Sequence, residues 1–251
     1  MNIATRPADY WQAIIFDFDG VIVESGDIKA QAFAELYRHH GETIAQAAVT
    51  YHRANGGMSR YLKFHYFQQN LLNYPPLTKE EEQELDRRFS ELVMNAVISC
   101  QPVAGAEALL HRMVDQIPLF VASGTPESEL RIIVEQRDLS RYFTEVRGSP
   151  RLKETLVADI LSAYPLVPER VLMIGDALVD YESAHQNGIA FLGRVRYPLV
   201  PERVLMIGDA LVDYESAHQN GIAFLGRVRP GDTNPFPESV EIVPDLCLIA
   251  M

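Results

Sequence analysis

Asp17 and Asp19 are the residues of this sequence best placed to do chemistry, because they follow an apolar run and only Phe18 separates them. Alternate residues of a β-strand point to the same side, so both carboxylates face one site. Gly20 comes next and permits a tight turn. One carboxylate of such a pair can act as a nucleophile while the other transfers protons. We therefore predict a reactive site at the end of this strand.

Three residues further along the chain, Ser123, Gly124 and Lys153, are suited to binding a phosphate. Ser123 ends a second apolar run and Gly124 follows it, so a hydroxyl and backbone N–H groups can bind phosphate oxygens. Lys153 lies early in a helical stretch, where its ammonium can balance the charge of a carboxylate and a phosphoryl group. These residue types predict phosphate chemistry.

A third apolar run, at residues 171–174, leads into Gly175 and Asp176, and Asp180 follows one helical turn later. Carboxylate oxygens suit hard cations such as Mg²⁺, so Asp176 is a candidate metal ligand. In open parallel sheets, ligands bind at the carboxyl ends of the strands. The sequence therefore predicts that Asp176 lies near Asp17.

These motifs, in this order, resemble the haloacid dehalogenase superfamily, and more narrowly its branch of phosphoglycolate phosphatases and β-phosphoglucomutases with a helical cap. The resemblance covers nearly the whole chain. It implies Asp17 as nucleophile, Asp19 as general acid and base, Ser123 and Gly124 as the phosphate site, and Lys153 as stabilising cation. It also implies Mg²⁺ bound by Asp17, the backbone carbonyl of Asp19 and Asp176, with Asp180 supporting the site.

The implied activity is the Mg²⁺-dependent hydrolysis of a small phosphorylated metabolite through an aspartyl-phosphate intermediate. True dehalogenases of the superfamily lack the second aspartate of the first motif, so Asp19 favours phosphoryl transfer. A β-phosphoglucomutase-like sugar-phosphate mutase is the alternative, but residues 21–27 lack the histidine that such mutases usually carry. The sequence therefore favours a phosphatase.

The elements that must position these residues alternate between apolar strands and helices. This pattern predicts a doubly wound, mostly parallel sheet with helices on both faces, a Rossmann-like α/β fold. We expect a helix at residues 125–137, with Thr125 as its N-cap and Pro126 at its first position. The predicted strands are residues 13–18, 119–122, 171–174, 190–192, 204–207 and 223–225.

Residues 25–100 differ from the rest of the chain, because they contain no convincing strand. We predict that they form a helical cap domain, and that residues 1–24 and 101–251 form the α/β core. The expected helices are residues 28–40, 60–73 and 79–97.

Substrate selection is expected in this cap, as its closure would enclose the substrate. Arg60, with Arg53 and Lys63, could contact an acidic or polyhydroxy substrate. Solvated surface charges are an equally good interpretation of the same three cations.

Residues 164–196 recur, residue for residue, as residues 197–229. Each copy contains a strand, an acidic turn, a helix and a second strand. One core can seat only one such strand beside the nucleophile strand. We expect the first copy there, because it keeps the shorter connection between Lys153 and the acidic turn.

The alternative is that Asp209 and Asp213 of the second copy complete the metal site. The displaced copy is too apolar to remain solvated, so we expect it to extend the sheet edge or to pair with another chain in a homo-oligomer. A hypothesis of another class is that the duplication impairs the metal site and leaves an inactive, self-associating module.

The composition restricts the partners. A net charge of −12 repels nucleic acid, and no segment has the apolar length of a membrane span or a signal peptide. Cys100 and Cys247 show no metal-ligand spacing and fit a reducing cytoplasm. The expected partner is a small phosphorylated metabolite, with neither nucleic acid nor membrane.

Overall fold

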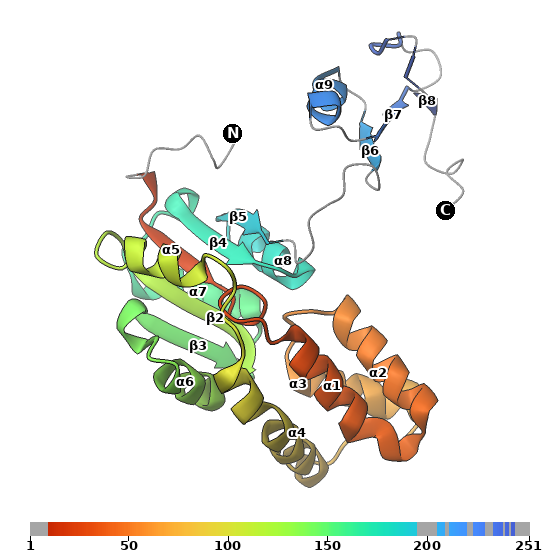
Figure 1. Cartoon of the computed structure of the whole chain (residues 1–251), viewed down its shortest axis with the longest axis vertical. Helices are drawn as coiled ribbons and strands as arrows, with labels where there is room; N and C mark the ends of the chain where they lie inside the picture. The colour runs from red at the N-terminus through yellow and green to blue at the C-terminus, as the bar shows by residue number, and fades with distance from the viewer. Residues whose placement is uncertain are drawn as a thin grey trace. The chain divides into compact units, whose positions relative to one another are not determined.

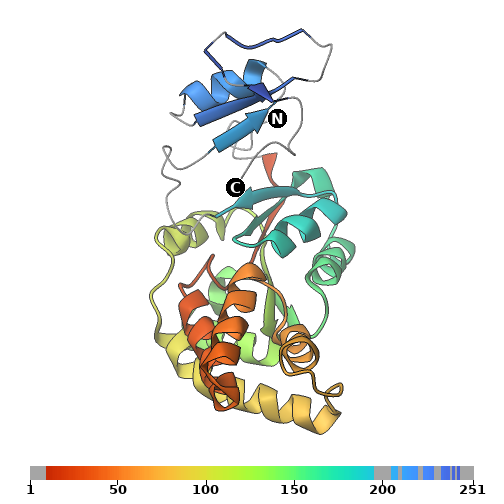
Figure 2. The ribbon, with the colours of Figure 1, turned by 90° about the vertical axis from the view of Figure 1, so that its right-hand side faces the viewer.

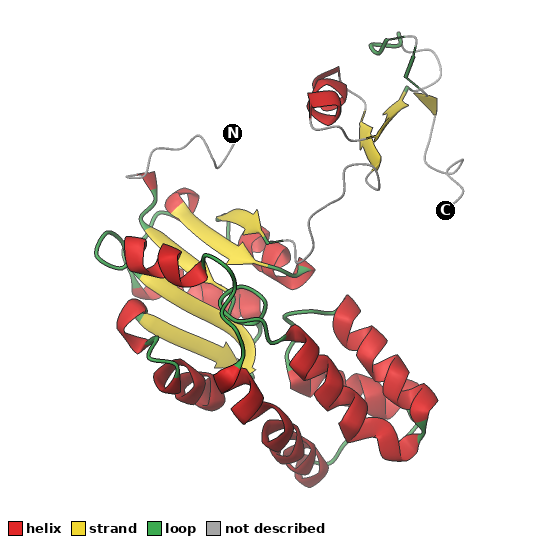
Figure 3. Cartoon of the chain, viewed as in Figure 1, coloured by secondary structure: helices red, strands yellow, loops and turns green. Residues whose placement is uncertain are grey.

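The computed structural model describes most of the chain, which divides into two compact units, Met1–Arg194 and Val195–Met251. Figure 1 shows their elements in chain order, and Figure 3 colours them by type. The described residues are 10–194, 205–208, 211–219, 223–228, 233–237, 239–240 and 242–243.

The first unit contains a five-stranded sheet in the order β3-β2-β1-β4-β5, and every pair of neighbours is parallel. The central strands consist of apolar residues that are buried on both faces, as is usual for parallel strands covered by helices. The strands are β1 (Ala13–Phe16), β2 (Leu119–Pro126), β3 (Glu145–Ser149), β4 (Val171–Gly175) and β5 (Ala190–Gly193).

Helices cover both faces of this sheet (Figure 1). Ala13 and Ile15 of β1 belong to one buried cluster, together with α7 and α8, while Ile14 and Phe16 belong to the opposite cluster, with α5 and α6. The predicted doubly wound α/β fold is therefore confirmed. The helices are α5 (Ala106–Met113), α6 (Glu127–Gln136), α7 (Lys153–Ala163) and α8 (Leu178–Gln186).

The order of the strands reverses at β1. The chain runs outward from β1 through β2 to β3, and then returns to the other side of β1 to form β4 and β5. A crevice at the carboxyl ends of the strands is the usual ligand site at such a reversal. Asp17 follows β1 and Asp176 follows β4, so both lie at this place.

Four of the helices between β1 and β2 gather at one end of the unit (Figure 2), whereas α5 packs on the sheet. Phe33 of the first helix lies among the rings of three others, with centroid distances of 6.1 Å to Phe64, 5.5 Å to Phe67 and 4.4 Å to Phe89. The His52 ring of the second helix also lies 4.9 Å from Phe33, so this aromatic core joins all four helices. We call them the helical segment: α1 (Gly26–Tyr37), α2 (Glu42–Ala54), α3 (Arg60–Tyr66) and α4 (Lys79–Ser99).

Some sequence predictions differ from the structure. Thr125 is not the N-cap of α6, because it belongs to β2 and its hydroxyl donates a hydrogen bond to Asp19 at 2.7 Å. Pro126 takes the N-cap position. The expected helix at residues 60–73 ends earlier, at Tyr66, and continues as a π-helical turn over Phe67–Leu71. The sequence did not predict α2, α5, β3 or the short strand at Ile242–Val243.

The first copy of the repeat provides β4, α8 and β5, so the expected strand does lie beside β1. The second copy provides β6 (Leu205–Gly208), α9 (Leu211–Gln219) and β7 (Ala223–Arg227). With β8 (Ile242–Val243), its strands form a separate parallel sheet in the order β6-β7-β8 rather than lengthening the five-stranded one. None of the described helices has the length and apolar character needed to cross a membrane.

Candidate active site

Asp17 is buried at the end of β1, with an exposed fraction of 1%. Its Oδ1 lies 2.9 Å from the Lys153 Nζ, and its Oδ2 has no hydrogen-bond partner among the described residues. Burial raises the pKa of Asp17 well above its ordinary value, the charge of Lys153 opposes this rise, and the charge of Asp180 adds to it. A buried carboxylate oxygen without a donor is suited to a cation or an electrophile.

Three carboxylates converge at this point. An oxygen of Asp17, one of Asp176 and one of Asp180 lie within 4.8 Å of one another. A Cβ on Gly20 would lie 2.0 Å from the Asp176 Oδ2, so only glycine allows this carboxylate to approach the turn after Asp19. The like charges of the three acids need a cation among them, and the oxygen-only donor set fits Mg²⁺.

Asp180 differs from the other two acids because both of its oxygens are already engaged. Oδ2 accepts hydrogen bonds from the N–H groups of Asp176 and Ala177, at 3.1 and 3.0 Å, and Oδ1 accepts one from Lys153 at 2.5 Å. It thereby caps the start of α8 and fixes the backbone that carries Asp176. Asp17 and Asp176 are left as the carboxylates best able to bind a cation directly.

Lys153, the first residue of α7, is buried between Asp17 and Asp180. Burial alone would lower its pKa, but the two carboxylates raise it above its ordinary value. Lys153 therefore stays charged, and it holds the Asp17 carboxylate beside Asp180 of α8.

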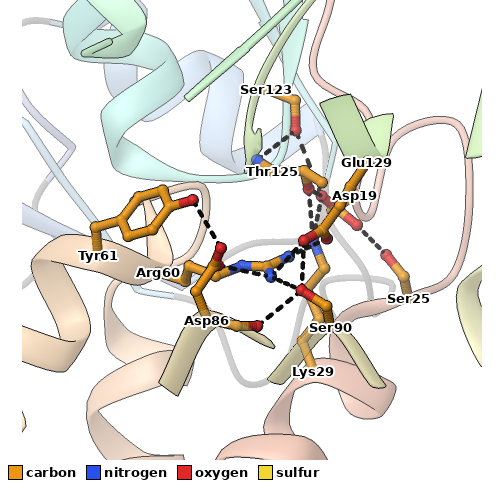
Figure 4. A network of polar contacts seen from close by, with 10 residues as sticks. All are labelled: Asp19, Ser25, Lys29, Arg60, Tyr61, Asp86, Ser90, Ser123, Thr125 and Glu129. Atoms are coloured by element: carbon orange, nitrogen blue, oxygen red, sulfur yellow. Dashed lines mark hydrogen bonds and ion pairs between the residues drawn. The ribbon is translucent and has the colours of Figure 1, made fainter. Parts of the chain in front are cut away.

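Asp19 is surrounded by hydrogen-bond donors (Figure 4). Its Oδ1 accepts from Ser25 at 2.6 Å, and its Oδ2 accepts from Lys29 at 2.5 Å, from Thr125 at 2.7 Å and from Ser123 at 3.4 Å. Burial opposes ionisation of Asp19, but the charge and the hydrogen bond of Lys29 lower its pKa below its ordinary value. Asp19 is therefore ionised in this arrangement.

Ser123 and Gly124 lie in the second half of β2, and the Ser123 hydroxyl faces Asp19. The Ser123 hydroxyl accepts a hydrogen bond from the Thr125 N–H at 3.1 Å. A Cβ on Gly124 would lie 2.3 Å from the carbonyl oxygen of Gly57, in the loop between α2 and α3. The predicted phosphate site thus lies where the helical segment touches the sheet.

Arg60 lines a cavity between the helical segment and the strand ends, but its guanidinium is already paired with acids of the protein. It donates two hydrogen bonds to Glu129 of α6, at 2.9 and 2.6 Å, and one each to Asp86 and Ser90 of α4, at 3.2 and 2.9 Å (Figure 4). Arg53, by contrast, is exposed and faces Asp27 at 3.5 Å. The contact of Arg60 with substrate stays a prediction, whereas its role in joining α3 to α4 and α6 is visible.

The cavity enclosed by the helical segment and the strand ends has a volume of about 70 Å³. Lys29, His52 and Thr125 also line it, and sequence reasoning did not select them. One signal was available for Lys29, because it lies one helical turn after Ser25, and both donate to Asp19. His52 and Thr125 offered no comparable signal.

Of the two acids of the second copy, Asp209 lies outside the described residues, and Asp213 falls within α9.

Known proteins place the chain in a family. Residues 14–194 match the family model of haloacid dehalogenase-like hydrolases, and the chain belongs to this family. The match ends at the residue that closes the first unit. The predicted family and the predicted class of enzyme, a phosphatase of this family, are thereby confirmed.

One relative and two solved structures are also similar to this chain. A phosphorylated carbohydrates phosphatase of Thermotoga maritima is 24% identical over 188 residues, which cover 71% of this chain and 82% of that protein. The structure is similar to that of a predicted phosphatase from Clostridium acetobutylicum, with a TM-score of 0.59, 16% identity, and coverage of 86% of this chain and 94% of the other. A predicted phosphoglycolate phosphatase from Haemophilus somnus gives a TM-score of 0.57, 18% identity, and coverage of 73% and 85%.

Proposed function

We propose that this enzyme is a Mg²⁺-dependent phosphatase that hydrolyses a small phosphorylated metabolite through an aspartyl-phosphate intermediate on Asp17. The observation that carries the proposal is the buried Asp17 carboxylate, whose Oδ1 faces Lys153 while its Oδ2 has no hydrogen-bond donor among the described residues. The family match supports the same chemistry.

In the first step, a carboxylate oxygen of Asp17 attacks phosphorus as the bond to the leaving oxygen breaks. Lys153 holds the nucleophile in place from its Oδ1 side. The Ser123 hydroxyl and the backbone N–H of Gly124 bind phosphate oxygens. A Mg²⁺ ion bound by Asp17, the backbone carbonyl of Asp19 and Asp176 would neutralise the charge between phosphate and carboxylates.

Asp19 transfers the protons. To protonate the leaving oxygen it must carry a proton, so Lys29 must first release the Asp19 carboxylate. The contact with Lys29 lowers the pKa of Asp19 and so favours the ionised form, which is the form needed for the second step, in which Asp19 takes a proton from the water that attacks the aspartyl phosphate.

The helical segment acts as the cap that encloses the substrate. Lys29 of α1 reaches Asp19, and the Gly57 carbonyl between α2 and α3 lies against Gly124. A substrate phosphate that binds between Asp17 and Ser123 must therefore have its leaving group directed toward these helices. Substrate selection belongs to the side chains that line the cavity there.

The test is the hydrolysis of p-nitrophenyl phosphate with Mg²⁺ and with a chelator. Asp17→Asn should lower kcat by at least about 10³-fold, because the nucleophile is lost. Asp115→Asn, at an exposed position of the same unit, is the matched control and should retain wild-type activity. Activity of the Asp17→Asn enzyme at the level of this control would refute the nucleophile.

A further inference from the structure

Among the described cations that line the cavity, Lys63 has no acidic partner. Its side chain lies on α3, lines the cavity and has an exposed fraction of 2%. Among the described residues, no carboxylate oxygen lies within ion-pair distance of the Lys63 Nζ, whose polar partner is the Nδ1 of His52 at 2.9 Å. A buried ammonium without a counter-charge is costly, so it needs an explanation.

The other buried cations of the site show the difference. Lys29 pairs with Asp19, Arg60 pairs with Glu129 and Asp86, and Lys153 pairs with Asp17 and Asp180. Each of these three positive charges is balanced within the protein. Lys63 faces the same cavity with only a neutral imidazole and an aromatic ring beside it.

His52 reinforces this arrangement. Burial lowers its pKa to about 3, and the charges of Lys63 and Lys29 contribute, so the imidazole is neutral. Its Nδ1 lies 2.9 Å from the Lys63 Nζ, and a neutral imidazole can accept a hydrogen bond from the ammonium there. The Phe33 ring lies beside both groups, 5.7 Å from the Lys63 Nζ and 4.9 Å from the imidazole centroid. These contacts fix the position of the amine but do not neutralise its charge.

We propose that Lys63, positioned by His52, binds a carboxylate on the leaving group of the substrate. The inference rests on the proposed phosphatase function and names the substrate class: short phosphorylated acids. The phosphate would lie at Asp17 and Ser123, and the carboxylate would take the two N–H donors of the ammonium that His52 does not use.

A carboxylate on the substrate would compensate the buried positive charge of Lys63. Burial lowers the pKa of Lys63 to about 7, and the charge of Lys29 contributes, so the protein by itself holds the proton on this amine only weakly. A carboxylate beside the amine restores the ion pair without any further desolvation of Lys63. A neutral alcohol at the same place would gain only a hydrogen bond. The site should therefore distinguish acids from alcohols of the same size.

The test uses two substrates that differ only in this group, 3-phosphoglycerate and glycerol 3-phosphate, with Mg²⁺ present. Wild-type enzyme should prefer the acid in kcat/KM by at least about 30-fold. Lys63→Met should remove at least about tenfold of this preference, mainly through KM for the acid, and change kcat/KM for the alcohol by less than about threefold. Lys79→Met, at an exposed position of α4, is the control and should behave as wild type.

Equal losses on both substrates in Lys63→Met would show a merely structural role and would overturn the proposal. An absent preference in the wild-type enzyme would do the same.

A binding measurement separates this inference from the proposed function. Calorimetric titration of the wild-type protein with glycerate, in the presence of Mg²⁺, should show binding that glycerol does not show and that Lys63→Met abolishes. If the enzyme hydrolyses neither phosphate ester, the phosphatase proposal fails, while glycerate binding lost in Lys63→Met still supports the carboxylate site. If phosphate is released but glycerate binds equally to the wild-type protein and to Lys63→Met, the carboxylate site is refuted and the phosphatase proposal stands.

Discussion

Residues 164–196 and 197–229 have the same sequence but lie in different sheets. Their local structures agree closely, since β4 pairs with β5 in the same register as β6 pairs with β7. The stacked rings of Tyr181 and His185 have centroids 5.8 Å apart, and those of Tyr214 and His218 are 5.7 Å apart. Their surroundings differ, because only the first copy has β1 beside it.

The comparison shows which properties a segment carries with it and which it receives from its neighbours. Strand, helix and register are reproduced in both copies, so the local sequence determines them. The chemistry of the acids depends on Asp17 and Lys153, which the structure brings only to the first copy among the described residues. Matched substitutions in the two copies can test this conclusion.

The largest difference is expected at the metal-binding acid. Asp176→Ala should reduce Mg²⁺-dependent kcat/KM by at least about 10³-fold, and Asp209→Ala should change it by less than about twofold. Initial rates across a Mg²⁺ titration measure both. The reverse result would mean that the second copy completes the site in solution.

The next largest difference concerns stability. Asp180→Ala leaves Lys153 with one carboxylate and two N–H groups without an acceptor, which should cost about 3–5 kcal/mol of unfolding free energy. Asp213→Ala should leave the unfolding of the first unit unchanged. Trp11 is the single tryptophan and lies in the first unit, so its fluorescence in urea reports this unit. Equal shifts in both variants would contradict the comparison.

A smaller effect on stability, with a defined pH dependence, is expected from the ion pair between Lys29 and Asp19. Lys29→Met should destabilise the first unit by about 2 kcal/mol at neutral pH, because an ionised Asp19 loses a charged donor. Lys29 lowers the pKa of Asp19, so its contribution is present above the ordinary aspartate value of 3.8 and disappears as the pH falls through the lowered value.

Urea titrations of the Trp11 signal at neutral and at acidic pH measure this difference, with Lys79→Met as the control. A difference between Lys29→Met and wild type that grows as the pH falls would disprove the assignment.

The smallest difference is expected at the end of each copy. Arg194 donates to the Gly20 carbonyl at 2.5 Å and to Glu24 at 2.5 Å. These groups are partly exposed, so Arg194→Ala should cost under about 1 kcal/mol in the Trp11 transition. Arg227→Ala, at the equivalent position of the second copy, should have no effect on it. A shift in both would indicate that the two ends share an environment.

The sequence allowed prediction of those site residues whose positions are set by an apolar strand. Asp17, Asp19, Ser123 and Asp176 could be predicted because each follows an apolar run, and parallel strands end at one edge of a sheet. It was not informative for β3, whose residues 145–149 include Glu145 and Arg147 and lack a continuous apolar pattern.

Contacts between separate elements also escaped prediction. The hydrogen bonds that Lys29 donates to Asp19, Lys63 donates to His52 and Arg60 donates to Glu129 each join residues on different elements. Their formation depends on how the helices pack against one another and against the sheet, which a single sequence does not encode in its periodicity. Arg60 was selected for its charge, but its acidic partners could not be foreseen.

The pairing of β7 with β8 has a consequence for the history of the chain. Because β5 repeats the sequence of β7, removal of residues 197–229 would join Arg196 to Pro230 and place Ile242–Val243 after β5 at the distance that now separates them from β7. Gly193 could then pair with Ile242 in the same register in which Gly226 now pairs with it. Deletion of residues 197–229 would therefore leave the same Arg–Pro junction before residue 230 and keep the spacing between a repeat strand and Ile242–Val243.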